Sequence, residues 1–135
     1  MHKQIFVNIA ISDMQKSQDF FKKLGFTFNP DFTNEQGACM VISDDIYAML
    51  LTRDFFQGFT GKPLVNAKEA TEVLICLSCE SRAEVDDLVA RARAAGGAVP
   101  REPQDHGFMY AHGFEDLDGH IWELVHMAPG EVPAA

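Results

Sequence analysis

The sequence predicts an α+β fold built from two βαβββ modules. Three observations predict it: a length of 135 residues, a strand pattern followed by a capped helix in each half, and glycine at the end of each helix. A chain of this length buries roughly two-thirds of its unfolded surface and needs no disulfide or metal to fold. We place module one at 1–58, a connector at 59–69, module two at 70–128 and a frayed tail at 129–135.

The first half begins with alternating side chains over 5–11, which is typical of a strand. Asp13 is a good helix N-cap, and apolar residues follow it at helical spacing until Gly25 ends the helix. Further strands are expected over 25–29, 38–43 and 46–52. The first half therefore reads β-α-β-β-β.

The second half repeats this plan without repeating the residues. A β-rich run over 72–79 precedes the capping box Ser81–Glu84, and Gly96-Gly97 ends the helix that follows. Asp118-Gly119 is a strong hairpin turn. The remaining strands are expected near 98–99, over 108–115 and over 120–127.

Composition excludes several partners. The formal net charge is −9, from 11 basic and 20 acidic residues, and Lys and Arg form no block. Nucleic acids and anionic membranes need clustered positive charge, so we expect neither as a partner. The apolar run at 5–11 is too short for a membrane span and lacks a signal peptide's cleavage region.

The cysteines indicate a reducing compartment. Cys39, Cys76 and Cys79 are an odd number in a chain large enough to fold without them. Cys76 and Cys79 have the CxxC spacing, but in a strand their thiols point to opposite faces. We expect reduced, mostly buried thiols in a cytoplasmic protein.

Two motifs carry a family resemblance. Residues 7–17 with Phe20-Phe21 and Leu24-Gly25-Phe26 form the first, and the run FEDLDGHIWEL at 114–124 forms the second. Over about residues 4–127 the chain resembles the vicinal oxygen chelate superfamily of glyoxalases, bleomycin resistance proteins and extradiol dioxygenases. Within it, the chain most resembles predicted lactoylglutathione lyases. The resemblance implies that the two βαβββ modules form a curved mixed sheet around a cleft and, commonly, that the protein is a homodimer.

The resemblance also implies four metal-ligand positions, which fall at Phe6, Leu50, Leu74 and Glu123. Three of these are hydrocarbon side chains, and one carboxylate cannot supply the donors that Zn²⁺ or a similar ion requires. We therefore expect no metal and no other cofactor. A metal site at a different place could use His112 together with Glu123. Alternatively, the histidines of the last 30 residues are surface groups or only support the residues of the site.

Glu123 is the most informative position. Its apolar neighbours of the same parity indicate that it points toward an apolar interior, where its ionised form is disfavoured unless Tyr110, His112 or Asn8 donates to it. Glu123 is our candidate catalytic base. It can equally anchor a ligand or act as a structural acceptor.

Other residues are candidates for ligand binding. Tyr110 and Trp122 can stack on a ligand or belong to the core, and Phe55, Phe56 and Phe59 either cap a pocket or anchor the connector. The full set of candidate ligand-binding residues is Phe6, Asn8, Leu50, Leu74, Tyr110, His112 and Trp122.

We expect a protein that binds a small, partly apolar molecule in its cleft, without the usual metal. The alternative is a lyase or isomerase of the glyoxalase type that uses Glu123 with an atypical metal site or none. A third hypothesis is a domain that only dimerises. The expected partners are thus a small molecule and a second copy of the chain.

Overall fold

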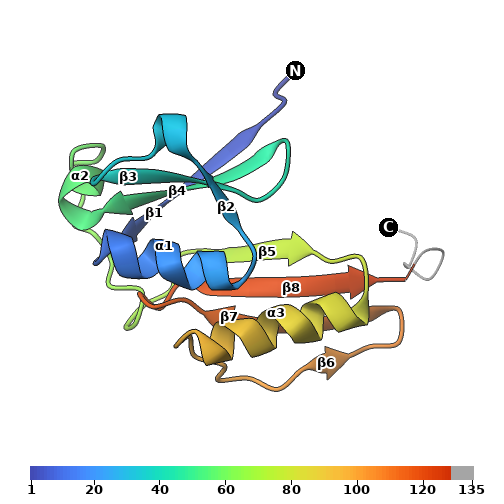
Figure 1. Cartoon of the computed structure of the whole chain (residues 1–135). Helices are drawn as coiled ribbons and strands as arrows, with labels where there is room; N and C mark the ends of the chain where they lie inside the picture. Colours follow the sequence, from blue (N-terminus) through green and yellow to red (C-terminus); the bar gives the residue numbers. More distant parts are fainter. Residues whose placement is uncertain (129–135) are drawn as a thin grey trace. The chain divides into compact units, whose positions relative to one another are not determined.

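The computed structural model describes residues 1–128 and has the predicted α+β class with two βαβββ modules (Figure 1). The predicted tail at 129–135 lies outside the described residues. The chain divides into two compact units, Met1–Val65 and Asn66–Ala135, called unit 1 and unit 2 below. Each unit contains its own four-stranded mixed sheet. Within residues 1–128, no helix is long and apolar enough to cross a membrane.

Unit 1 has the strand order β1-β4-β3-β2, in which β1 is parallel to β4 and the other neighbours are antiparallel. Its elements are β1 (Ile5–Ile11), α1 (Met14–Lys23), β2 (Thr27–Asn29), the 3-10 helix η1 (Pro30–Phe32), β3 (Gly37–Val41), β4 (Ile46–Thr52) and α2 (Arg53–Gln57). Strands β1 and β4 have the predicted bounds. The pattern did not predict η1 or α2.

Helix α1 begins and ends where the sequence predicts. The Asp13 carboxylate accepts a hydrogen bond from the Lys16 N–H at 3.0 Å, and Gly25 takes a φ of 100° just after the helix. The helix packs on β3 and β4 and buries Phe20 and Phe21. These are the two largest fully buried side chains of unit 1.

Unit 2 repeats this topology with the order β5-β8-β7-β6, in which β5 is parallel to β8. Its elements are β5 (Leu74–Ser78), α3 (Arg82–Ala94), β6 (Gln104–Asp105), β7 (Met109–Glu115) and β8 (Ile121–Met127). The strand expected near 98–99 is only an isolated bridge from Ala98 to Glu115. Pro100 and Pro103 explain this difference, because proline has no N–H to continue a ladder.

Helix α3 is capped at both ends. Ser81 Oγ accepts from the Glu84 N–H at 3.0 Å, and the Glu84 carboxylate in turn accepts from the Glu80 N–H at 3.1 Å. Gly96 has a φ of 102° past the C-terminus. The buried face of α3 packs on β7 and β8, so it covers one face of the unit 2 sheet.

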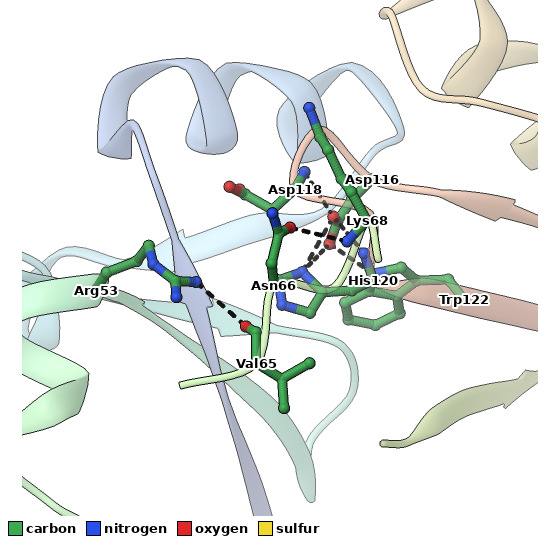
Figure 2. A network of polar contacts seen from close by, with 8 residues as sticks. All are labelled: Arg53, Val65, Asn66, Lys68, Asp116, Asp118, His120 and Trp122. Carbon is green, nitrogen blue, oxygen red and sulfur yellow. Dashed lines mark hydrogen bonds and ion pairs between the residues drawn. The ribbon is translucent and has the colours of Figure 1, made fainter. Parts of the chain in front are cut away.

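A buried carboxylate holds the turn between β7 and β8 (Figure 2). Asp116 is only 5% exposed, and its Oδ1 accepts from the backbone N–H groups of Asp118 and His120 at 3.0 Å each. Its Oδ2 accepts from Trp122 Nε1 at 3.0 Å, and His120 Nδ1 lies 3.0 Å from the same oxygen. Both carboxylate oxygens therefore bond to groups of the hairpin itself.

We expect Asp116→Ala to lower the free energy of unfolding by about 2–5 kcal/mol, because the fully buried Trp122 indole N–H and two turn amides lose their acceptor. Urea denaturation followed by circular dichroism measures this. The control is Glu72→Ala, an exposed acid of unit 2, which should change stability by less than about 0.5 kcal/mol. Equal stability of the two variants would contradict the structural role of Asp116.

Candidate functional site

One face of the unit 2 sheet is left uncovered by α3. Strand alternation places the buried Trp122 and Leu124 toward the helix and Glu123 on the opposite, open face. The open face is hollowed by a pocket of about 270 Å³. The residues of β7 and β8 that border it include Met109, Ala111, Glu115, Ile121 and Glu123.

Gly113 shapes the centre of this pocket. It pairs with Glu123 across β7 and β8, and the two strands approach closely there. A Cβ at position 113 would lie 2.6 Å from the Trp122 carbonyl oxygen, so only glycine fits without a shift of the backbone. The position of the missing Cβ is filled by the neighbouring backbone of β8, so glycine at 113 lets the two strands pair closely beside Glu123.

Glu123 is half-buried on this open face, not in an apolar interior. Of the three donors considered from the sequence, the two in unit 2 make no hydrogen bond to it among residues 1–128. Tyr110 donates to Asp86 at 2.6 Å, and a His112 ring nitrogen donates to the Arg101 carbonyl at 2.8 Å. The third, Asn8, donates to the Phe6 carbonyl at 3.3 Å.

Cys76 is the neighbour of Glu123 on the other side of β8. The sequence predicted mostly buried thiols, but Cys76 is exposed, whereas Cys39 and Cys79 are buried; all three are free. Partial desolvation and, after it, the Glu123 carboxylate raise the pKa of the Cys76 thiol. Cys76 therefore stays protonated at neutral pH and brings no charge to the open face.

A clamp fixes the outer wall of the pocket. The two-residue strand β6 carries Gln104, which borders the pocket, and Asp105, which binds Arg82 of α3 through two hydrogen bonds of 2.6 and 3.0 Å. Arg82 also donates to the Gly107 carbonyl and stacks over the Tyr110 ring at 5.0 Å. These bonds, first the Arg82 guanidinium and then the Gly107 N–H, lower the pKa of Asp105 to about 2.

The structure brings only some of the predicted site residues to this pocket. Glu123 and His112 border it. Trp122 is completely buried and bonded to Asp116, so it is a core residue and not a ligand contact. Tyr110 belongs to the clamp, and Leu74 lies on the open face of β5 with 53% of its surface exposed. Arg101, Gln104 and Glu115 border the pocket and were not predicted; only strand parity could have indicated Glu115.

In unit 1 the structure corrects the position of Leu50. Leu50 pairs with Ile9 and is fully buried, whereas Phe6 pairs with Tyr47 and is 49% exposed. Residues 6 and 50 thus lie on opposite faces of the sheet. Tyr47 stacks on Phe6 with ring centroids 4.8 Å apart, so Tyr47 is the residue of β4 that accompanies Phe6.

The connector aromatics also have defined places in unit 1. Phe55 and Phe56 lie on α2, and the Phe55 ring meets Phe59 edge-on with centroids 5.3 Å apart. A Cβ at Gly37 would lie 4.0 Å from the Phe55 ring, so Phe55 packs beside β3. Phe59 is 71% exposed. Phe55 therefore anchors this stretch on the unit 1 sheet.

The family model of the Glyoxalase/Bleomycin resistance protein/Dioxygenase superfamily matches residues 3–124. The chain belongs to this superfamily. A hypothetical protein of S. aureus, SA1046, has 32% sequence identity and a TM-score of 0.79, with 93% of this chain and 94% of that chain covered. A search of the curated proteins found no match.

More distant members of the superfamily share the fold. A glyoxalase-related enzyme from Fulvimarina pelagi has 20% identity and a TM-score of 0.78, covering 93% of this chain and 88% of that one. The fosfomycin resistance protein FosX from Mesorhizobium loti has 16% identity and a TM-score of 0.70, with 97% of each chain covered. At these identities the likeness concerns the fold alone.

A divalent metal does not fit the side chains present. No three His, Cys, Asp or Glu side chains gather in residues 1–128. The open face of unit 1 carries Phe6, Asn8 and Tyr47 along β1 and β4, and none of these is a strong ligand. His112 and Glu123 alternate to opposite faces of neighbouring strands.

We expect the stabilisation from the Arg82–Asp105 clamp to disappear at low pH. The folded-state pKa of Asp105 is about 2, below its ordinary value of 3.8, so the contribution is present above pH about 4 and is lost as the pH falls toward 2. Urea denaturation of the wild type and Asp105→Asn at a series of pH values measures it. The difference in unfolding free energy should shrink over that window, and a constant difference would show that the clamp is not ionic.

Proposed function

We propose that the protein binds a small, partly apolar molecule in the pocket on the open face of the unit 2 sheet, without a divalent metal. The pocket itself carries this proposal: it offers about 270 Å³ of space over a mainly apolar surface, and polar or charged residues make up half of its border. Such a space lies near the lower end of ligand sites, roughly 300–1,000 Å³. It suits a compact ligand.

Two further observations support binding. The described side chains do not form a metal-ligand set, which removes the basis for glyoxalase chemistry through a metal. The fold is shared with a fosfomycin resistance protein, whose name refers to a small antibiotic. Free thiols at all three cysteines support our proposal that the protein is cytoplasmic.

The alternative is a lyase or isomerase of the lactoylglutathione lyase type that uses Glu123 as a base. One observation favours it. Glu123 borders the pocket, and no hydrogen bond or ion pair of its carboxylate exists among residues 1–128. A carboxylate without a protein donor is free to accept a proton from a bound molecule, provided that the proton lies within hydrogen-bond reach.

We expect Ala111→Phe to abolish the binding of compounds found in a thermal-shift screen, because the larger side chain fills the pocket. Amide chemical shifts of β7 and β8 would show whether each compound binds there. Glu123→Gln should keep the fold and lose affinity if the charge anchors the ligand, or lose turnover if Glu123 is the base. Unchanged affinity in both variants would place the binding outside this pocket and contradict the proposal. A screen without any binding compound would leave only a domain that dimerises.

We also propose that the protein forms a homodimer. Each sheet has an unpaired edge strand beside its longest strand, β1 in unit 1 and β5 in unit 2. Both edge strands expose large apolar side chains, among them Phe6 at 49% and Leu74 at 53%. Small domains tend to bury such edges and patches against a copy of themselves through a twofold interface.

We expect sedimentation equilibrium at micromolar concentration to give twice the mass of the chain. The double variant Phe6→Glu/Leu74→Glu should shift the protein toward monomer, because it places charges on the exposed edge strands. Lys3 is exposed, so Lys3→Glu serves as the control for added negative charge near β1. A monomeric wild type would contradict the proposal.

A further inference from the structure

We infer that the pocket of unit 2 selects a ligand with a positively charged group, such as a protonated amine, on a compact apolar body. The inference rests on the proposed binding function and adds the chemical class of the ligand. It follows from two carboxylates at the pocket, from the absence of a protein cation between them, and from the apolar surface around them.

The two carboxylates belong to Glu115 and Glu123. Gly113 pairs with Glu123, and Glu115 pairs with Ile121, so the two glutamates are diagonal neighbours on the open face. Diagonal neighbours in an antiparallel pair lie about 7–8 Å apart. The other two residues of these two pairs are Gly113 and Ile121, so no polar side chain lies between the carboxylates.

No protein cation neutralises this pair. Neither glutamate side chain has a hydrogen bond or ion pair among the described residues, and both are half-buried. Four charged side chains border the pocket, namely those of Glu102, Glu115, Glu123 and Arg101. Their net charge is −2. Arg101 and Glu102 are exposed neighbours in sequence, so the excess negative charge lies on the sheet.

A ligand cation would resolve this imbalance. Like charges that are partly withdrawn from water repel each other, whereas an ammonium group between them makes charge-assisted hydrogen bonds to either carboxylate. Gly113 borders the pocket and pairs with Glu123, so it places no side chain between the two carboxylates. Met109, Ala111 and Ile121 offer apolar surface to the rest of the molecule. An anionic ligand would have only the exposed Arg101 as a partner.

Three probes with the same apolar cage test the inference: adamantan-1-amine, 1-adamantanol and adamantane-1-carboxylate. They differ mainly in charge, and their affinities are measured by titration of amide chemical shifts over 109–123. We expect the amine to bind about tenfold or more tighter than the carboxylate, with the alcohol between them. The double variant Glu115→Gln/Glu123→Gln should remove this preference and still bind the alcohol.

Glu72→Gln is the matched control for net charge, because Glu72 is an exposed acid of unit 2 that does not border the pocket. It should keep the amine preference. If Glu72→Gln weakens the preference for the amine as much as Glu115→Gln or Glu123→Gln alone does, the preference comes from the overall negative charge of the protein. That result would overturn the inference. Equal affinities for the three probes, or tighter binding of the carboxylate, would also overturn it while the binding function stands. Failure of all three probes to shift these amides would overturn the proposed function as well.

Discussion

The bonds to the buried Asp116 carboxylate determine which face of β8 meets α3. They hold two turn amides and the Trp122 indole N–H, and β8 starts within this turn. A slip of one residue in the pairing of β7 and β8 would move every side chain of β8 to the other face. Glu123 would then lie against α3 and Trp122 on the open face. The position of Glu123 at the pocket therefore depends on a carboxylate seven residues earlier in the chain.

The pocket follows from the same register. Trp122 and Leu124 fill the space under α3, so the side chains between them must lie on the uncovered face. Gly113 opposite Glu123 lets the strands approach closely, because the Cβ of any other residue would meet the Trp122 carbonyl oxygen. The Arg82–Asp105 clamp adds the outer wall, because a two-residue strand such as β6 has too few ladder bonds to hold itself. The packing of α3 on one face of the unit 2 sheet therefore determines which side chains border the pocket on the other face.

Most of the fold could be predicted from local signals, whereas the site could not. Asp13, Ser81 and the glycines after each helix are local, and both helices begin at these caps. Leu50 shows why local signals do not predict the site. Counting from a family motif placed Leu50 in β4, but the face on which its side chain lies depends on the pairing of β4 with β1. An error of one residue in that count moves the side chain to the other face of the sheet. Trp122 and Glu123 were both proposed as site residues, yet adjacent residues of a strand cannot share a face. The clamp joins residues 23 positions apart, so no local pattern could indicate it.

The acids of unit 2 differ in a way that separates structure from function. Asp116 is buried, and its oxygens accept from amides, an indole and an imidazole, so the fold itself satisfies it. Glu115 and Glu123 are half-buried on one face, with no donor or cation from the described residues. Like charges directly opposite each other destabilise a sheet, and two carboxylates that are diagonal neighbours offer the fold no attraction of their own. This contrast is the reason for assigning the proposed binding function to this face, where both carboxylates can contact a ligand.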